Sequence, residues 1–207
     1  MDPDPLSQTT LAILAGGVGS RMGRAKGSLD LQGRPILSYL LERLAWPGPK
    51  WLVTSPGREN PPGYEGFDRE LVDPEAGVGP LRGILTALER VETPVLVVVP
   101  VDMPGLAIEQ VREVVRQLAL HASARGLMFR RRVGGDSQIE PFPIGLRYEA
   151  ASEIRERLRL KQRSVHRLLE DPSFVSVPAP EDWSEEVWTN LNEPQNLETF
   201  IRKHANG

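Results

Sequence analysis

The sequence predicts a single-domain α/β protein in which a doubly wound, mostly parallel sheet carries helices on both faces. Short apolar runs alternate with segments whose apolar residues recur at helical spacing, the order typical of such sheets. Val95–Val99 holds five consecutive apolar residues, four of them β-branched, and an uninterrupted run of this kind indicates a strand covered on both sides. The 207 residues contain no repeat and no linker, so we expect one domain spanning 1–207.

The first half of the chain has the clearest alternation of strands and helices. Strands are expected at Leu11–Ala15, Trp51–Thr54, Glu70–Val72 and Val95–Val99. Helices are expected at Ile36–Leu44, Pro80–Glu89 and Ile108–Leu120. The first two helices start at a proline, which suits a first helical turn because its missing N–H has no partner there.

After about Arg125 the elements become shorter. Strands are expected at Leu127–Phe129 and Pro143–Arg147, on either side of a Gly-Gly-Asp turn at 134–136, and again at Phe174–Val177 and Val187–Leu191. Helices are expected at Ala150–Leu160, at Val165–Glu170 and from Pro194 to about His204.

The composition excludes several classes of protein. The net charge of −3 argues against a protein whose main function is to bind the nucleic-acid backbone. The absence of cysteine excludes disulfides, thiolate metal sites and a cysteine nucleophile. The three histidines lack metal-ligand spacing, which argues against a structural zinc site. No apolar stretch reaches the ~20 residues that cross a bilayer, and the acidic start is unlike a signal peptide. We expect a cytoplasmic protein that binds neither nucleic acid nor membrane.

The charge is unevenly distributed along the chain. Residues 125–167 contain 11 Lys and Arg against 5 Asp and Glu, and the excess is concentrated in Arg155, Arg157, Arg159, Lys161 and Arg163. This stretch is either a solvated helix face or a surface that attracts a second, phosphorylated ligand.

A glycine-rich segment follows the first predicted strand and points to phosphate binding. It fits neither the P-loop, because its last glycine and lysine are not adjacent, nor the dinucleotide fingerprint, because Met22 stands where a glycine is required. Backbone N–H groups of such a loop can approach phosphate oxygens closely, and two cations can neutralise phosphate charge. The segment carries the glycines Gly16, Gly17, Gly19 and Gly23 and the cations Arg21 and Lys26.

The segment resembles the Leu-Ala-Gly-Gly-x-x-x-Arg-Met-Gly-x-x-Lys signature of the molybdenum cofactor guanylyltransferases (MobA-like), within the wider nucleoside triphosphate transferase family. Three later motifs also resemble this family, in the family's order. They are Asp73 followed by Gly-Pro-Leu-x-Gly at 79–83, Pro-x-Asp-x-Pro at 100–104, and Asn-x-Asn-x-Pro at 190–194.

The resemblance implies a Rossmann-like fold and a guanylyltransferase that uses GTP and Mg²⁺. Such an enzyme transfers GMP to the phosphate of molybdopterin, releases pyrophosphate and forms a guanine dinucleotide cofactor, for which cofactor-accepting apoenzymes are further expected partners. The N-terminal half is expected to bind the nucleotide, and about 125–207 the acceptor. The family's nucleotide contacts carry over to Leu14, Ala15, Gly16, Lys26 and Asp73, and its magnesium ligand to Asp102.

The chemistry assigns each of these residues a role. Lys26 is expected to hold the α-phosphate and Arg21 the departing β- and γ-phosphates, with loop amides at Gly17 and Gly19. Asp102 follows the most buried strand, at the edge where open α/β sheets bind ligands, and also contacts the nucleotide through its metal. Asn192 is expected to add an oxygen ligand or a supporting contact.

Two positions depart from the family pattern. Thr54 or Ser55 stands where the family often has an asparagine that touches the base, so we expect Thr54 to contact the nucleotide there. Ala25 stands where an aspartate commonly precedes the lysine. These departures leave open a cytidylyl- or sugar-phosphate transferase, and also a non-catalytic nucleotide-binding protein that delivers cofactor to an apoenzyme.

Simpler structural roles remain for three of the polar motifs. Asp102 could cap the following helix, and Asp73, before a proline, could only form a turn. Asn190 and Asn192 would project to the same side of a strand, or could cap the last helix.

Overall fold

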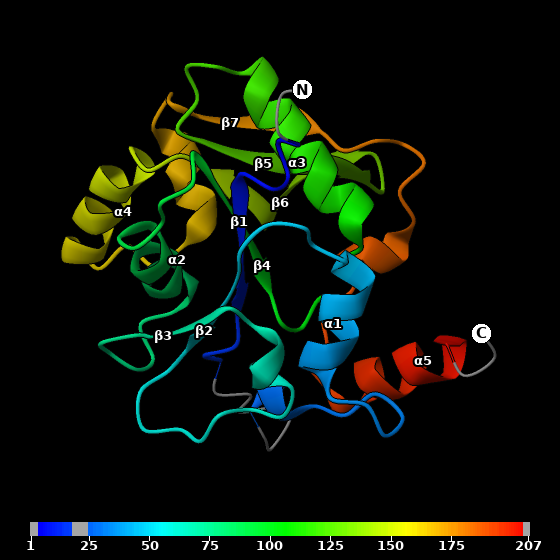
Figure 1. Ribbon diagram of the computed structural model, residues 1–207. Helices are drawn as coiled ribbons and strands as arrows, with labels where there is room; N and C mark the ends of the chain where they lie inside the picture. Colours follow the sequence, from blue (N-terminus) through cyan, green and yellow to red (C-terminus); the bar gives the residue numbers. More distant parts are fainter. Residues whose placement is uncertain (1–3, 18–24, 205–207) are drawn as a thin grey trace.

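A seven-stranded sheet forms the centre of the computed structural model, which describes residues 4–17 and 25–204 (Figure 1). The strand order is β3-β2-β1-β4-β6-β5-β7, and β6 alone runs antiparallel to its neighbours. The expected doubly wound, mostly parallel α/β sheet is therefore confirmed. The strands are β1 (Thr9–Leu14), β2 (Lys50–Thr54), β3 (Arg69–Val72), β4 (Val95–Pro100), β5 (Gly126–Val133), β6 (Asp136–Leu146) and β7 (Phe174–Pro178).

In the part of the chain that the structure describes, five α-helices cover the two faces of this sheet. They are α1 (Ile36–Leu44), α2 (Pro80–Leu88), α3 (Ile108–Leu120), α4 (Ala150–Arg159) and α5 (Pro194–His204). Helices α1, α3 and α5 pack on one face, and α2 and α4 pack on the other (Figure 1). Short 3-10 helices lie between them: η1 (Lys26–Ser28), η2 (Tyr64–Gly66), η3 (Val165–Glu170) and η4 (Glu185–Trp188).

The continuous apolar strands bury alternate residues in two separate cores. In β4, Val97 and Val99 belong to the core under α1 and α3, whereas Leu96 and Val98 belong to the core under α2 and α4. Both sets are fully buried, which is why the strand shows no polar alternation in sequence. The covering of both faces predicted from this run is confirmed.

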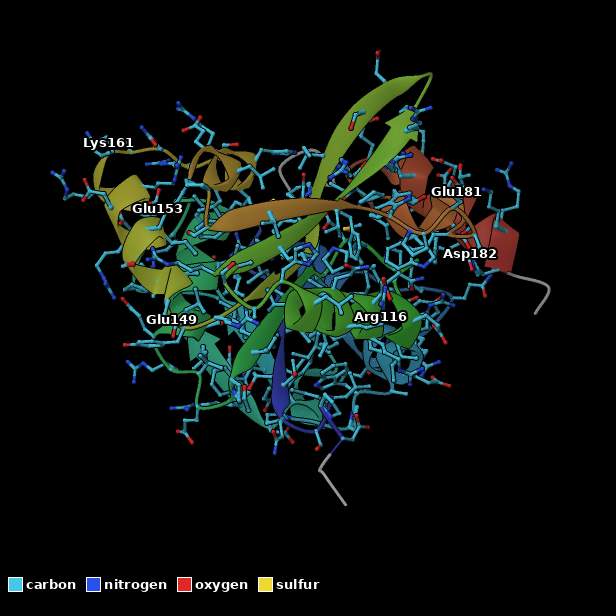
Figure 2. All side chains as sticks on the ribbon, turned by 90° about the horizontal axis from the view of Figure 1, so that it is seen from above. Arg116, Glu149, Glu153, Lys161, Glu181 and Asp182 are labelled. Carbon is cyan, nitrogen blue, oxygen red and sulfur yellow. The ribbon has the colours of Figure 1, made fainter. Side chains whose placement is uncertain are left out.

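The strands β5 and β6 are longer than the sequence predicted and form a hairpin. Gly134 and Gly135, at its tip, have φ angles of 59° and 99°, the left-handed conformation that a two-residue hairpin turn requires. The outer part of the hairpin pairs only with itself and projects from the body of the protein (Figure 2). The predicted strands were too short because the polar outer residues lack the burial signal of the inner ones.

The predicted strand at Val187–Leu191 was wrong. The segment is a 3-10 helix that ends at Trp188 and is followed by an irregular stretch, in which the Asn192 N–H donates to the Asn190 carbonyl at 3.0 Å. The apolar residues are buried by packing instead of by strand pairing, since Trp188 lies against Trp183 with ring centroids 5.7 Å apart. Asn190 and Asn192 therefore do not alternate as strand residues would.

Among the described residues, every helix is too short or too polar to span a membrane.

Candidate active site

A cavity of about 480 Å³ opens where the parallel strands β1, β2 and β4 end. Parallel strands have their carboxyl ends at the same edge of a sheet, here the lower edge in Figure 1, and ligands of open α/β sheets bind there. Six residues that the sequence predicted line this cavity. They are Leu14, Gly16, Gly17, Lys26, Asp73 and Asp102.

The start of the glycine loop is held against the end of β2. The Ala15 N–H donates to the Val53 carbonyl at 2.8 Å, and the Ser55 hydroxyl donates to the Gly16 carbonyl at 2.7 Å. A Cβ at Gly16 would lie 2.6 Å from the Ser55 Oγ, so only glycine permits this close approach. Gly19 and Arg21 lie outside the described residues, and their phosphate contacts stay predictions.

Three polar side chains from distant parts of the chain meet, and two of them, Lys26 and Asp102, line the cavity. The Lys26 ammonium, in η1, forms an ion pair with the Asp102 carboxylate and also donates to the Asn192 Oδ1 at 2.5 Å. The side chains of Lys26 and Asp102 are 20% and 10% exposed, so the pair is partly shielded from water. The structure thus brings together three of the residues to which the sequence assigned chemistry.

Asp102 does not cap the helix that follows it. The N-cap of α3 is Ala107, and the Asp102 side chain reaches Lys26 instead. Its main-chain carbonyl accepts a hydrogen bond from the Leu191 N–H at 2.8 Å, which fixes the irregular stretch before α5 beside β4. This hydrogen bond explains how Asn192 reaches the site without belonging to the sheet.

Asp73 is a buried carboxyl group at the cavity wall, and it does more than form a turn. It follows β3, is 8% exposed, and its Oδ1 has no hydrogen-bond partner among the described residues. Burial raises the pKa of Asp73, although the neighbouring Thr86 hydroxyl and the Arg82 charge partly oppose this rise. An unpartnered buried acceptor of this kind indicates a place for a ligand donor.

The structure separates the two candidates for the base contact. The Thr54 hydroxyl donates to the Glu70 Oε1 at 2.7 Å, and Thr54 does not line the cavity, contrary to the sequence expectation. The next residue, Ser55, does line it. Successive strand residues point to opposite faces, and Thr54 faces the side away from α2.

Most of the predicted basic stretch is neutralised by nearby carboxylates. Arg157 pairs with Glu153 and Glu170, Arg159 pairs with Glu156, and Arg155 pairs with Glu89. Figure 2 shows Glu149, Glu153 and Lys161 at the periphery of the molecule, around α4. Arg155 and Arg159 are exposed, which favours a solvated helix face for them, whereas Arg157 is buried. Arg163 differs, because it donates to the carbonyl of Gly77 at 3.4 Å, and Gly77 lines the cavity.

Two parts of the cavity wall were missed as site residues. The loop before α2 contributes Glu75, Gly77 and Val78, and the N-cap residue Gly79, with a φ of 101°, directly precedes Pro80. The Gly-Pro pair was the available signal, since it marks a helix start that faces the cavity. Phe142, in β6, also lines the cavity, and no sequence motif marked it, because only the pairing of β6 with β4 brings it there.

Comparisons with known proteins show the family of this chain. The family profile of the MobA-like NTP transferase domain matches residues 11–177. A molybdenum cofactor guanylyltransferase from Pseudomonas paraeruginosa is 35% identical over 172 residues, which are 82% of this chain and 83% of the relative. One from Xanthomonas euvesicatoria pv. vesicatoria is 31% identical over 201 residues, covering 87% and 95% of the two chains.

A solved structure shares the fold. Molybdopterin-guanine dinucleotide biosynthesis protein A from Archaeoglobus fulgidus superposes with a TM-score of 0.79 at 22% identity, over 96% of this chain and all of the other. The family profile and the two relatives, together with the shared fold, place the chain in the family of MobA-like NTP transferases.

Proposed function

We propose that this chain transfers GMP from GTP to the phosphate of molybdopterin, releasing pyrophosphate and forming a guanine dinucleotide cofactor. The observation that carries the proposal is that Lys26 pairs with Asp102 on the wall of the cavity where β1 and β4 end, and that Asn192 contacts the same ammonium. The names of the relatives support guanylyl transfer and the molybdenum cofactor as its destination.

The reaction exchanges one phosphoanhydride bond for another. A phosphate oxygen of molybdopterin attacks the α-phosphorus of GTP, the bond to the bridging β-oxygen breaks, and pyrophosphate leaves with the bonding electron pair. Such a transfer depends on positioning and on neutralising charge, with little covalent help from the protein. Lys26 supplies positive charge for the α-phosphate, and the amides of the loop after β1 supply hydrogen-bond donors. Arg21 is proposed to hold the β- and γ-phosphates.

The residues at the site fit a magnesium ion. The Asp102 carboxylate and the Asn192 side-chain oxygen already converge on one cation, the Lys26 ammonium, and both are the oxygen donors that Mg²⁺ prefers. Within residues 4–17 and 25–204, no group of three His, Cys, Asp or Glu could hold a metal alone. This small donor set suits an ion that also binds phosphate oxygens and water. Mg²⁺, when bound, supplies charge neutralisation on the phosphates.

Asp73 supports guanine as the base. The Watson–Crick edge of guanine presents two adjacent donors, the N1–H and the N2 amino group, to which a carboxylate can bind through both oxygens. Cytosine presents one donor beside an acceptor, which would face the carboxylate unfavourably. Asp73, whose Oδ1 has no hydrogen-bond partner among the described residues, lines the cavity together with Ser55, whose hydroxyl already donates to the Gly16 carbonyl.

The acceptor is proposed to bind over the second half of the chain. Arg163 is the member of the basic stretch whose side chain contacts a cavity-lining loop. It therefore offers a positive charge for the phosphate of molybdopterin. Apoenzymes that accept the finished cofactor are further proposed partners.

The direct test is pyrophosphate release from GTP with molybdopterin and Mg²⁺, compared with CTP. We expect release with GTP, and a loss of about 100-fold or more in Asp102→Asn, as for other groups that stabilise transferring charge. Asp182→Asn is the matched control, because Asp182 is exposed on another part of the surface (Figure 2). Preference for CTP would refute the guanylyl assignment. Binding of GTP without release would favour the accessory protein.

The proposed base contact has its own test. Inosine triphosphate lacks the 2-amino group of guanine, so the wild type is expected to prefer GTP by about tenfold or more, for a charged hydrogen bond worth ~1.5–3 kcal/mol. Asp73→Asn should remove most of this preference, whereas Asp182→Asn should keep it. An unchanged preference in Asp73→Asn would show that the base is recognised elsewhere.

A further inference from the structure

We propose that Lys26 makes divalent-cation binding depend on nucleotide, by occupying the metal's oxygen ligands until a triphosphate draws it away. The proposal rests on the proposed function, which assigns Asp102 and Asn192 to the metal. In the structure these two side chains hold the Lys26 ammonium. The lysine can therefore bind either the Asp102 and Asn192 oxygens or the triphosphate, and the metal site is open only when it binds the triphosphate.

The ammonium and a metal ion exclude each other at these oxygens. Lys26 Nζ contacts both the Asp102 Oδ2 and the Asn192 Oδ1, so it lies where a cation shared by them would lie. Mg²⁺ would bind the same oxygens at about 2.0–2.1 Å and would stand in contact with the ammonium. Two cations at such a distance in a partly shielded site repel each other strongly.

Without nucleotide, displacement of the lysine by a metal ion is unfavourable for the lysine. The Asp102 side chain is only 10% exposed, and Lys26 would give up a charged partner for solvent alone. A triphosphate changes this balance because it offers the ammonium a new partner with more negative charge. It also brings phosphate oxygens that complete the coordination of the metal.

The lysine stem is already placed for this exchange. A Cβ added to Gly17 would lie 3.7 Å from the Lys26 Cδ, so the stem passes beside the start of the glycine loop. Rotation about the terminal bonds of a flexible four-carbon chain is then enough to move the ammonium from one partner to the other. The backbone of η1 does not have to move.

Linkage makes the effect reciprocal and measurable. If nucleotide tightens metal binding by some factor, metal tightens nucleotide binding by the same factor, and such factors are commonly about 5- to 150-fold. The prediction is therefore a wild type that binds Mn²⁺ weakly alone and at least about 5-fold more tightly with nucleotide. Removing the ammonium should release the metal site in the absence of nucleotide.

The experiment is a titration of the full chain with Mn²⁺, with free ion followed by electron paramagnetic resonance. It is run with and without the α,β-methylene analogue of GTP, and no acceptor is present. Lys26→Met, which keeps the length of the stem without its charge, should bind Mn²⁺ alone at least about 5-fold more tightly than the wild type. Lys203→Met, an exposed lysine of α5, should behave as the wild type.

Two results would overturn the proposal. One is a wild type whose Mn²⁺ affinity is the same with and without the analogue. The other is a Lys26→Met protein that unfolds at the wild-type temperature and gains no Mn²⁺ affinity. If Lys26→Met does not fold, Lys26→Gln takes its place under the same criteria. The double variant Lys26→Met/Asp102→Asn should lose the gain, which ties the metal to that carboxylate.

The metal-only titration uses neither GTP nor molybdopterin. A gain in Lys26→Met together with no pyrophosphate release by the wild type would therefore support the lysine exchange and refute the guanylyltransferase. Pyrophosphate release without any gain would do the reverse.

Discussion

Gly105→Ala is expected to disturb the site from a distance, through the segment that carries Asn192. Gly105 lies in the loop between β4 and α3, and a Cβ there would be 2.0 Å from the main-chain oxygen of Glu186. Real Cβ contacts essentially never fall under 3.0 Å, so the segments around Gly105 and Glu186 must separate by about 1 Å or more. The obstacle is backbone, which cannot turn aside as a flexible side chain can.

The size of the effect follows from overpacking a buried contact, which destabilises by about 1–3 kcal/mol. For a domain of this length 1 kcal/mol lowers Tm by about 2–4 °C, so Gly105→Ala should unfold roughly 2–12 °C below the wild type. Because Glu186 precedes the stretch that places Asn192 beside Lys26, Mn²⁺ binding with nucleotide should weaken as well.

The assay is thermal unfolding by circular dichroism, followed by the Mn²⁺ titration on folded protein. Gly135→Ala, at the hairpin tip, is the control, since an added Cβ meets nothing within 4 Å there. Its φ of 99° disfavours alanine, so some loss of Tm is expected, with metal binding unchanged. A Gly105→Ala protein with the wild-type Tm and wild-type Mn²⁺ binding would contradict this prediction.

Three further predictions concern single side chains. Burial raises the pKa of Asp73 in the folded protein. The free energy of unfolding of the wild type should therefore fall as pH rises from the ordinary aspartate pKa through this raised pKa. Denaturant titrations at several pH values should show this fall in the wild type and not in Asp73→Asn. Ser55→Ala should weaken GTP binding by about 1 kcal/mol in calorimetry, through the lost hydroxyl at Gly16, whereas Thr54→Val should leave it unchanged. Arg157→Ala should cost about 1–3 kcal/mol in chemical denaturation, because its nearly buried guanidinium joins α4 to η3, and an unchanged midpoint would contradict that role.

The sheet could be predicted because its central strands are buried on both sides. Val95–Val99 and Leu11–Ala15 are apolar without interruption, and both lie in the sheet where the sequence placed them, within one or two residues. The segment Val187–Leu191 is apolar for another reason, the packing of Trp188 against other rings. Composition over a few residues does not distinguish these two kinds of burial.

The site could be predicted only as a set of separate motifs. Lys26 and Asp102 are far apart in sequence, and their ion pair depends on the parallel pairing of β1 with β4. The choice between Thr54 and Ser55 depends on which face of β2 carries the cavity, which one residue of register decides. The positive charge of 125–167 was real, but its pairing with carboxylates needs positions in space, as Arg155 with Glu89 illustrates.

The hydrogen bond from the Leu191 N–H to the Asp102 carbonyl has a consequence for biosynthesis of the protein. The strands β1 to β4 can pair early in translation, since their order in space is nearly their order in the chain. Asn192 arrives only after all seven strands have been made. The contact of Asn192 with Lys26 can therefore form only after the segment that follows β7 has been synthesised, whereas the pairing of β1 with β4 needs no residue beyond Pro100.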